Sequence, residues 1–349
     1  MHVLVAGAAG YVGSRLVPAL LSEGHTVTAG MREPARASRY AWSSSPDVRV
    51  LGLDLLEEDS VEQAVTGVDA IFYLVHSMGD GEGFVARDRR AAYQLARAAE
   101  SAGVQRLVYL SGILPPAVPD EQLSVHLRSR HQVEEILVSG GVPALVLRAA
   151  IVIGAGSTSF EILRQLSERL PVVPVPAWLT NQVQPIAIED VVRLLLAGLR
   201  GEPRHGHYDI GGDEVLSYAE LVERYAEVAR LQRVQVRVPI PQRRLAGAAA
   251  GLVAGVPAGT VQALFDSLGH DLVCGDHVVR EVLDGAEGPY LSVREALERS
   301  LAEHPLPDDS QAAREGDPPW TGGNVSLDEG RAHRSGSLLD RLLLGLPRR

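Results

Sequence analysis

The stretch that most constrains the fold lies at the start of the chain, where an apolar run, 3–6, leads into Gly7, Gly10 and Gly13. A helical pattern of apolar residues follows and ends at Gly24, before a second β-branched run. This order predicts a β-α-β unit whose glycine-rich turn opens the first helix. A pyrophosphate can rest on the backbone N–H groups at such a helix N-terminus, and a side chain in the turn would hold it away. The turn therefore predicts a dinucleotide site with contacts from Gly7, Ala9, Gly10, Tyr11, Val12 and Gly13; a turn that merely tolerates glycine is the alternative.

Apolar runs and helical patterns keep alternating after this unit, which predicts an α/β fold with a doubly wound parallel sheet. Further strands are expected at 48–53, 70–75, 106–110 and 144–149. A chain of 349 residues, 46% of them hydrophobic, can bury this sheet and still form a smaller second lobe. We expect a Rossmann domain over 1–155 and a C-terminal substrate lobe over 156–305, with some chain returning to the first domain. The composition then changes to Pro, Asp, Gly and Ser, so 306–349 is expected to be a disordered tail.

The composition also excludes several classes of partner and site. A net charge of −11 argues against a nucleic-acid surface, which needs clustered basic residues. The single cysteine, Cys274, excludes a disulfide framework and a cysteine-rich metal site, and no metal is expected. No apolar stretch reaches the roughly 20 residues of a transmembrane segment. We therefore expect a soluble, cytoplasmic protein, a monomer or homodimer, whose partner is a small molecule.

The end of the second strand indicates which dinucleotide is bound. An acidic residue there would hydrogen-bond a free 2′-hydroxyl and repel a 2′-phosphate, but Met31 occupies that place and Arg32 follows, with Arg36 close behind. This favours NADP(H) over NAD(H), with Arg32 as the contact. The alternative is that both arginines are solvated loop residues.

The ends of the third and fourth strands supply further candidate contacts. Ligands bind outside the carboxyl ends of parallel strands, so Leu74, Val75, His76 and Ser77 should line the cofactor groove. His76 could instead be a structural hydrogen-bonding residue. Asp54 and Leu55 end the third strand, and Asp54 has the alternative of capping a helix or turn.

The GxxGxxG spacing, the segment HSMG at 76–79 and PIAIEDVVRLLLAGL from Pro185 together resemble the atypical, extended-like short-chain dehydrogenase/reductases. The HSMG segment is similar to that of an NAD(P)H-binding branch related to the NmrA-like proteins. The resemblance covers about residues 1–305. It implies that the acid at Asp54 and its neighbour Leu55 contact the adenine, and that Ala150 and Ile151 touch the cofactor near its nicotinamide.

The same resemblance points to a catalytic set that departs from the family pattern. Ser111 stands where the family keeps a catalytic Ser or Thr, and the helix HLRSRHQVEEIL lines up with the family's YxxSKxxxE helix. His126 then takes the place of the tyrosine and Arg130 that of the lysine; the chain contains no lysine at all. Arg130 can supply positive charge but cannot exchange protons near neutral pH. His126 could donate a proton, although Arg130 one turn away favours its neutral form. The alternative is a site that binds cofactor without turning it over.

In the lobe, Val234, Val236, Val238 and Ile240 alternate as in a half-buried strand. Ser217 with Glu220 forms the capping box of one helix, and Ser292 with Glu295 caps another. The alanine-rich helix expected at 242–254 is apolar around most of its circumference. It could line an apolar substrate channel, face a membrane or be buried in the lobe.

These observations predict an NADPH-dependent oxidoreductase that reduces a small apolar carbonyl, enone or quinone. Since the tyrosine and lysine are missing, a non-catalytic protein that senses NADP(H), as NmrA-like proteins are thought to do, is the alternative. A sugar-nucleotide epimerase or dehydratase is a third reading, which normally relies on the two absent residues.

Overall fold

The computed structural model is an α/β protein built on a seven-stranded parallel sheet, as predicted. The structure describes residues 1–76, 83–116, 118–239, 243–275, 277–283, 288–305 and 309–335. The strand order is β3-β2-β1-β4-β5-β6-β11, so the direction of winding reverses between β1 and β4. The strands are β1 (His2–Ala6), β2 (Thr26–Met31), β3 (Val48–Gly52), β4 (Ala70–Tyr73), β5 (Arg106–Gly112), β6 (Ala144–Ala149) and β11 (Gly206–Ile210).

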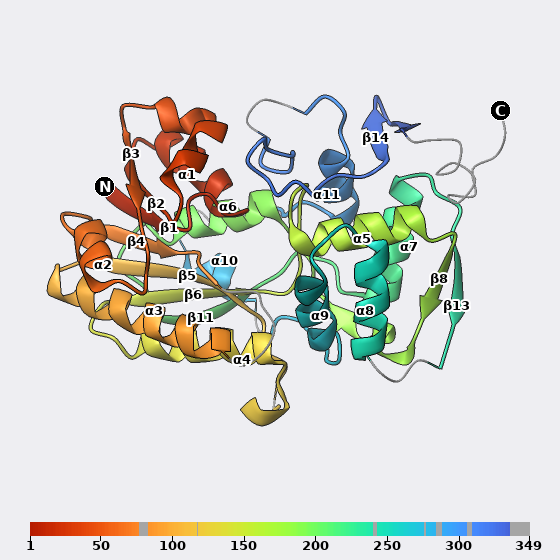
Figure 1. Cartoon of the computed structure of the whole chain (residues 1–349), viewed down its shortest axis with the longest axis horizontal. Helices are drawn as coiled ribbons and strands as arrows, with labels where there is room; N and C mark the ends of the chain where they lie inside the picture. The colour runs from red at the N-terminus through yellow and green to blue at the C-terminus, as the bar shows by residue number, and fades with distance from the viewer. Residues whose placement is uncertain are drawn as a thin grey trace.

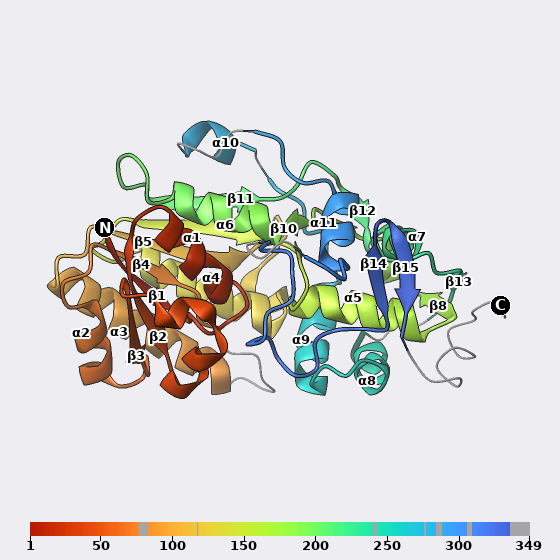
Figure 2. The same cartoon turned by 90° about the horizontal axis from the view of Figure 1, so that it is seen from above.

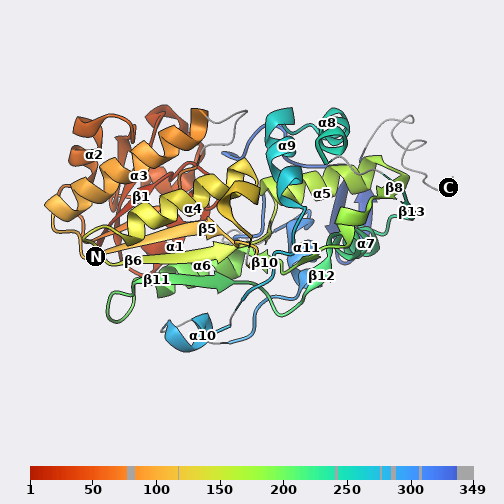
Figure 3. The same ribbon diagram turned by 90° about the horizontal axis from the view of Figure 1, so that it is seen from below.

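Helices cover both faces of the sheet because alternate strand residues are apolar on both sides (Figure 1). In β1, Val3 and Val5 pack toward α1 (Gly13–Ser22) and α6 (Ile188–Ala197). Leu4 and Ala6 pack on the opposite face. That face is covered by α2 (Glu58–Val65), α3 (Gly83–Ser101) and α4 (Val125–Val138), as Figure 3 shows from below.

The second part of the structure is a lobe beside the carboxyl ends of the strands (Figures 1 and 2). Its long central helix, α5 (Thr158–Arg169), packs against α7 (Tyr218–Val228) and α8 (Arg243–Val253). The capping boxes predicted at Ser217 and Ser292 are both present. The other lobe elements are α9 (Ala258–Ser267), α11 (Val293–Ser300), the short strands β7 (Val152–Ile153), β9 (Gln182–Val183), β10 (Ile186–Ala187) and β12 (Leu216–Ser217), and the ribbon of β8 (Val172–Val175) with β13 (Val234–Arg237).

The sequence predicts a half-buried strand at 234–240. A strand is present there, β13, but the prediction that it is half-buried was wrong. All four residues of β13 are exposed, and β13 pairs only with β8. No packed layer of the described chain covers the apolar side chains of β13; Val236 and Val238 instead line a cavity. Ile240 lies outside the described residues.

The expectation of a disordered tail from residue 306 was also wrong for 309–335. Residues 309–318 run back to the glycine-rich turn, and the hairpin of β14 (Val325–Asp328) and β15 (Arg331–Arg334) packs on the lobe. Composition missed this order because buried polar groups of α5 hold the segment: Glu161 accepts a hydrogen bond from Gly322 N at 2.8 Å, and Arg164 donates one to Val325 O at 2.8 Å. Residues 336–349, the rest of the expected tail, lie outside the described residues.

Candidate functional site

The glycine-rich turn is shaped so that side chains cannot enter it. Gly7 has φ +97°, and a Cβ there would lie 3.0 Å from the carbonyl oxygen of Leu74. A Cβ at Gly13 would lie 2.2 Å from the Gly7 carbonyl oxygen, and one at Gly10 would lie 3.1 Å from it. The turn therefore leaves its backbone bare at the N-terminus of α1, which is the arrangement that suits a pyrophosphate.

One cavity of about 1350 Å³ runs from this turn past the ends of the strands into the lobe. Gly13 does not line this cavity. Ser77 lies outside the described residues, as do the two residues that follow it in the HSMG segment. The structure brings the other predicted site residues together on the cavity wall: Gly7, Ala9, Gly10, Tyr11, Val12, Arg32, Asp54, Leu55, Leu74, Val75, His76, Ser111, His126, Arg130, Ala150 and Ile151.

At the adenosine end, two arginines and two acids edge the cavity. Arg32 is exposed, and Arg36 and Glu33 lie beside it on the wall. Asp54 accepts a hydrogen bond from Leu56 N at 2.9 Å, which is the turn role considered as its alternative, while its side chain still borders the cavity. The residues here fit an adenosine, with positive charge from Arg32 and Arg36 and negative charge from Glu33 and Asp54 on the same wall.

Ser111, His126 and Arg130 meet in the middle of the cavity. The ring of His126 lies 6.0 Å from that of His76 in an edge-to-face arrangement. One guanidinium nitrogen of Arg130 donates to Leu110 O at 2.8 Å, which fixes the side chain of α4 against the end of β5. The buried hydroxyl of Ser111 makes no hydrogen bond of good geometry with the described residues, although the phenol of Tyr109 is close by.

Desolvation and the charge of Arg130 favour the neutral imidazole of His126, and they act in the same direction on the more exposed His76. Desolvation, aided by the charge of Arg130, lowers the pKa of His126 from 6.5 to about 3. Desolvation, followed by Arg130 and His126, also lowers the pKa of His76 well below 6.5. A neutral imidazole can donate a hydrogen bond but is not an acid near pH 7. The direction of the His126 shift agrees with the effect expected from Arg130.

The family's helix motif also holds a structural pair. Glu134 of α4 accepts a hydrogen bond from Arg148 Nε of β6 at 2.9 Å, and the two residues form an ion pair. Ser129 donates to Asp88 of α3 at 3.0 Å, and Asp88 borders the cavity. Asp88 was not predicted, because the apolar pattern of α3 gives no sign that one polar residue turns toward a cavity.

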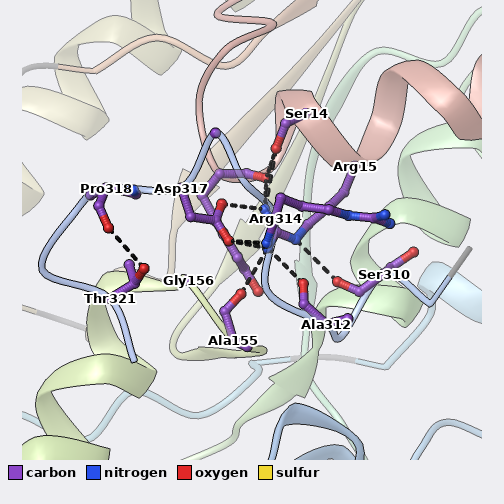
Figure 4. Close-up of polar contacts among 12 residues, drawn as sticks. Ser14, Arg15, Ala155, Gly156, Ser310, Ala312, Arg314, Asp317, Pro318 and Thr321 are labelled. Atoms are coloured by element: carbon purple, nitrogen blue, oxygen red, sulfur yellow. Dashed lines mark hydrogen bonds and ion pairs between the residues drawn. The ribbon is translucent and has the colours of Figure 1, made fainter. Parts of the chain in front are cut away.

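A segment that was not predicted from the sequence lies behind the glycine-rich turn. Gly316, Asp317 and Pro318 line the cavity next to Tyr11. Asp317 pairs with the buried Arg15 of α1 through two hydrogen bonds of 2.9 and 2.8 Å (Figure 4). The sequence offers two signals for this pair: an arginine in the first turn after a glycine motif and an isolated aspartate far downstream. No characteristic spacing connects them.

Two absences concern the described residues only. No group of three or more His, Cys, Asp or Glu side chains among them could hold a metal ion. In the part of the chain that the structure describes, no helix has both the length and the apolar character needed to cross a membrane.

A protein-family model described as NAD(P)H-binding matches residues 7–169. The chain is similar to 3-diazoavenalumate denitrifying reductase of Streptomyces sp., with 28% identity over 256 residues that cover 65% of this chain and 81% of the relative. It is also similar to ceramide reductase of Caulobacter vibrioides, with 26% identity over 70% of this chain and 76% of the relative. The chain therefore contains an NAD(P)H-binding domain, as predicted, and its similar proteins include named reductases.

Solved structures agree on the fold. Triphenylmethane reductase of Citrobacter sp. aligns with a TM-score of 0.66 at 18% identity, over 86% of this chain and 99% of that one. A nucleoside-diphosphate-sugar epimerase of Staphylococcus aureus aligns with a TM-score of 0.67 at 13% identity, over 85% of this chain and 99% of that one. At these identities the likeness shows a shared Rossmann-type fold and no particular reaction.

Proposed function

We propose that the chain is an NADPH-dependent reductase of apolar carbonyl compounds, enones or quinones, because it carries an NAD(P)H-binding domain and shares its fold with triphenylmethane reductase. The strongest support is that a single cavity connects the glycine-rich turn with the apolar lobe. Ser111, His126 and Arg130 line this cavity between the two. The reductases among the similar proteins, at 28% and 26% identity, support the reaction class.

The cofactor is held, in this proposal, by the turn at Gly7 and Gly10 and by Arg32 at the 2′-phosphate. When bound, the reduced dinucleotide supplies a hydride for the acceptor carbon. The acceptor oxygen gains negative charge as a result and needs donors and one proton. In this proposal the protein supplies the hydrogen-bond donors and solvent supplies the proton.

Ser111 and the neutral His126 can each donate a hydrogen bond to that oxygen, and the permanent charge of Arg130 stabilises it as its negative charge grows. With a pKa of about 3, His126 carries no imidazolium proton to give at pH 7, and Arg130 does not exchange protons there. The proton therefore comes from water in the cavity. His126 acts as a hydrogen-bond donor in this scheme, in place of the proton donor considered from sequence.

The test is oxidation of NADPH, followed by its absorbance, over a panel of ketones, aldehydes, enones and quinones. We expect turnover of at least one class, and Arg130→Met should lower kcat by about 10²-fold or more while NADPH binding persists. Silence over the whole panel, with NADPH binding confirmed by titration, would overturn the reductase proposal.

One observation favours a second candidate, a protein that senses the NADP(H) state without catalysis. His126 is a poor acid here, and the chain lacks the tyrosine and lysine of the resembled family. This candidate predicts different solution scattering profiles for the NADP⁺ and NADPH forms. Identical profiles together with turnover would remove it. A sugar-nucleotide reaction is disfavoured because the lobe half of the cavity is largely apolar.

A further inference from the structure

The wall of the lobe half of the cavity is mostly apolar, which does not suit a small polar substrate. It lies between α5, α8, α9 and the β8–β13 ribbon, beyond Ser111 and His126. The whole cavity exceeds the ~300–1,000 Å³ that one drug-sized ligand usually occupies, so it has room beyond the cofactor. Its lobe wall includes Leu163, Leu166, Leu170, Trp178, Val253 and Phe265.

The ribbon contributes an apolar face with no packed layer of the described chain over it. Val172 pairs with Val234, and Pro174 with Val236, so these four side chains lie on one face. Val172 and Val236 remain 50% and 43% exposed, yet Val172, Pro174 and Val236 line the cavity. An apolar surface of this kind gains free energy when a second apolar surface covers it.

Helix α8 forms the facing wall with small side chains. Ala246, Ala249 and Ala250 border the cavity, and Gly247 faces α9, where a Cβ would lie 3.0 Å from the Gln262 side chain. Small residues on this side leave the space open along the helix. Of the roles considered for this helix from sequence, its contacts support two: Ala250 packs in the lobe core against Ile162 and Val261, and Ala246 and Ala249 line the cavity.

Two buried hydroxyls point to a ligand in this apolar space. Tyr218, 5% exposed, and Ser167, fully buried, both line the cavity. Neither hydroxyl has a hydrogen-bond partner among the described residues. A buried hydroxyl without a partner is costly, so a ligand that supplies an acceptor would be favoured. The pKa of Tyr218 is raised by burial, which keeps the phenol a donor.

We propose that this half of the cavity, called here the lobe trough, binds the apolar chain of a long amphiphilic substrate. The substrate's carbonyl lies by Ser111, and a second oxygen along its chain accepts a hydrogen bond from Tyr218. The proposal rests on the proposed function for the reacting end, and it replaces the small substrate expected from sequence with a long one. Alanines of α8 and the valine face of the ribbon enclose the chain.

The experiment measures affinity instead of turnover, so that it separates the two proposals. The full chain is saturated with NADP⁺ and titrated with methyl ketones of increasing length, from butanone to dodecanone, by isothermal calorimetry. We expect each added methylene to strengthen binding about fourfold, equivalent to about 0.8 kcal/mol, until the trough is full. Affinity that does not change with chain length overturns the trough, even if short ketones are reduced. Length-dependent binding without turnover supports the trough and counts against the reductase.

Matched variants locate the binding. Ala249→Phe fills the trough from an exposed position of α8, and we expect it to weaken dodecanone at least about tenfold and butanone less than about twofold. Ala248→Phe, one residue away, exposed and off the wall, is the control and should change neither. Equal effects of the two variants would overturn the assignment.

The hydroxyl is tested with Tyr218→Phe against the exposed Tyr93→Phe. The probe is the methyl ester of a long-chain keto acid, which carries a second oxygen. We expect Tyr218→Phe to weaken this ester about tenfold relative to the plain ketone, with an unchanged or higher unfolding midpoint, because an unpartnered buried hydroxyl is lost. Equal loss for both probes would overturn the role of Tyr218.

Discussion

Arg15 and Asp317, 302 positions apart in the sequence, form a fully buried two-bond ion pair directly behind the glycine-rich turn (Figure 4). The same guanidinium donates to four backbone carbonyls: those of Tyr11, Ala155, Ser310 and Ala312. It therefore joins the turn, the start of the lobe and the C-terminal segment at one point. The glycine-rich turn is thus tied to a segment that lies far outside residues 7–169, the part of the chain that matches the NAD(P)H-binding model.

Removing one partner of this pair should be costly. We expect Asp317→Ala to lower the free energy of unfolding by about 3 to 5 kcal/mol, because the Arg15 charge stays buried without its counter-ion. Arg15→Met should cost at least as much, since the four carbonyls lose a donor as well. Urea denaturation measures both.

The control is an exposed pair on the surface of the lobe. Arg294 and Glu227 lie 3.1 Å apart with about half of each side chain exposed, so Arg294→Met should cost less than about 1 kcal/mol. A cost for Asp317→Ala as small as that of Arg294→Met would show that the buried pair does not hold the segment.

Gly10→Ala tests the turn without breaking the fold. A Cβ at Gly10 meets only the Gly7 carbonyl oxygen, at 3.1 Å, but it enters the space assigned to the pyrophosphate. We expect dinucleotide affinity to fall at least about tenfold, with less than about 1 kcal/mol lost in stability. Gly140→Ala, whose Cβ would make ordinary contacts after the end of α4, is the control for both measurements by calorimetry. Unchanged affinity in Gly10→Ala would move the pyrophosphate away from this turn.

Sequence patterns correctly predicted the parts of the structure that depend on interactions between residues close together in the chain. The glycine turn, the parallel strands and the capping boxes at Ser217 and Ser292 each depend on residues a few positions apart. Ser111 was predicted at the carboxyl end of a parallel strand, and His126 and Arg130, which lie on α4, came from the resemblance to the family's helix motif; all three line the same cavity.

What failed depends on contacts between distant segments. Residues 309–335 are held in place by hydrogen bonds with Arg15 and with Glu161 and Arg164 of α5. Amino-acid composition cannot predict such contacts between distant residues. The alternating valines predict a face on a core, but Val236 and Val238 line a cavity and Val234 is 62% exposed. A pattern of alternation states which face is apolar and cannot state what covers it.

The pH dependence of stability reports the environment of His126. Its pKa is about 3 in the folded chain, against about 6.5 when unfolded, so the unfolded state binds the extra proton as the pH falls. The stability that depends on neutral His126 is present above about pH 6.5 and is lost as the pH falls from there toward 3. By about pH 5 the loss reaches at most about 2 kcal/mol.

His126→Asn removes this titration. We expect the free energy of unfolding of the wild type to fall more between pH 7 and pH 5 than that of the variant, by up to about 2 kcal/mol in urea denaturation. Parallel curves for the two proteins would place His126 in a more solvated setting. They would also restore it as a proton donor near neutral pH.

Arg32→Ala tests the preference for NADP(H). If Arg32 meets the 2′-phosphate, the variant loses a charge-assisted contact worth about 1.5 to 3 kcal/mol, and NADPH binding weakens roughly tenfold to more than a hundredfold. NADH lacks the phosphate, so its affinity should change less than about threefold. Isothermal titration of both cofactors against wild type and variant decides the matter. Equal losses for the two cofactors would assign Arg32 to the adenine or to the fold, and a wild type that prefers NADH would overturn the cofactor preference while leaving the turn at Gly7 and Gly10 as the pyrophosphate site.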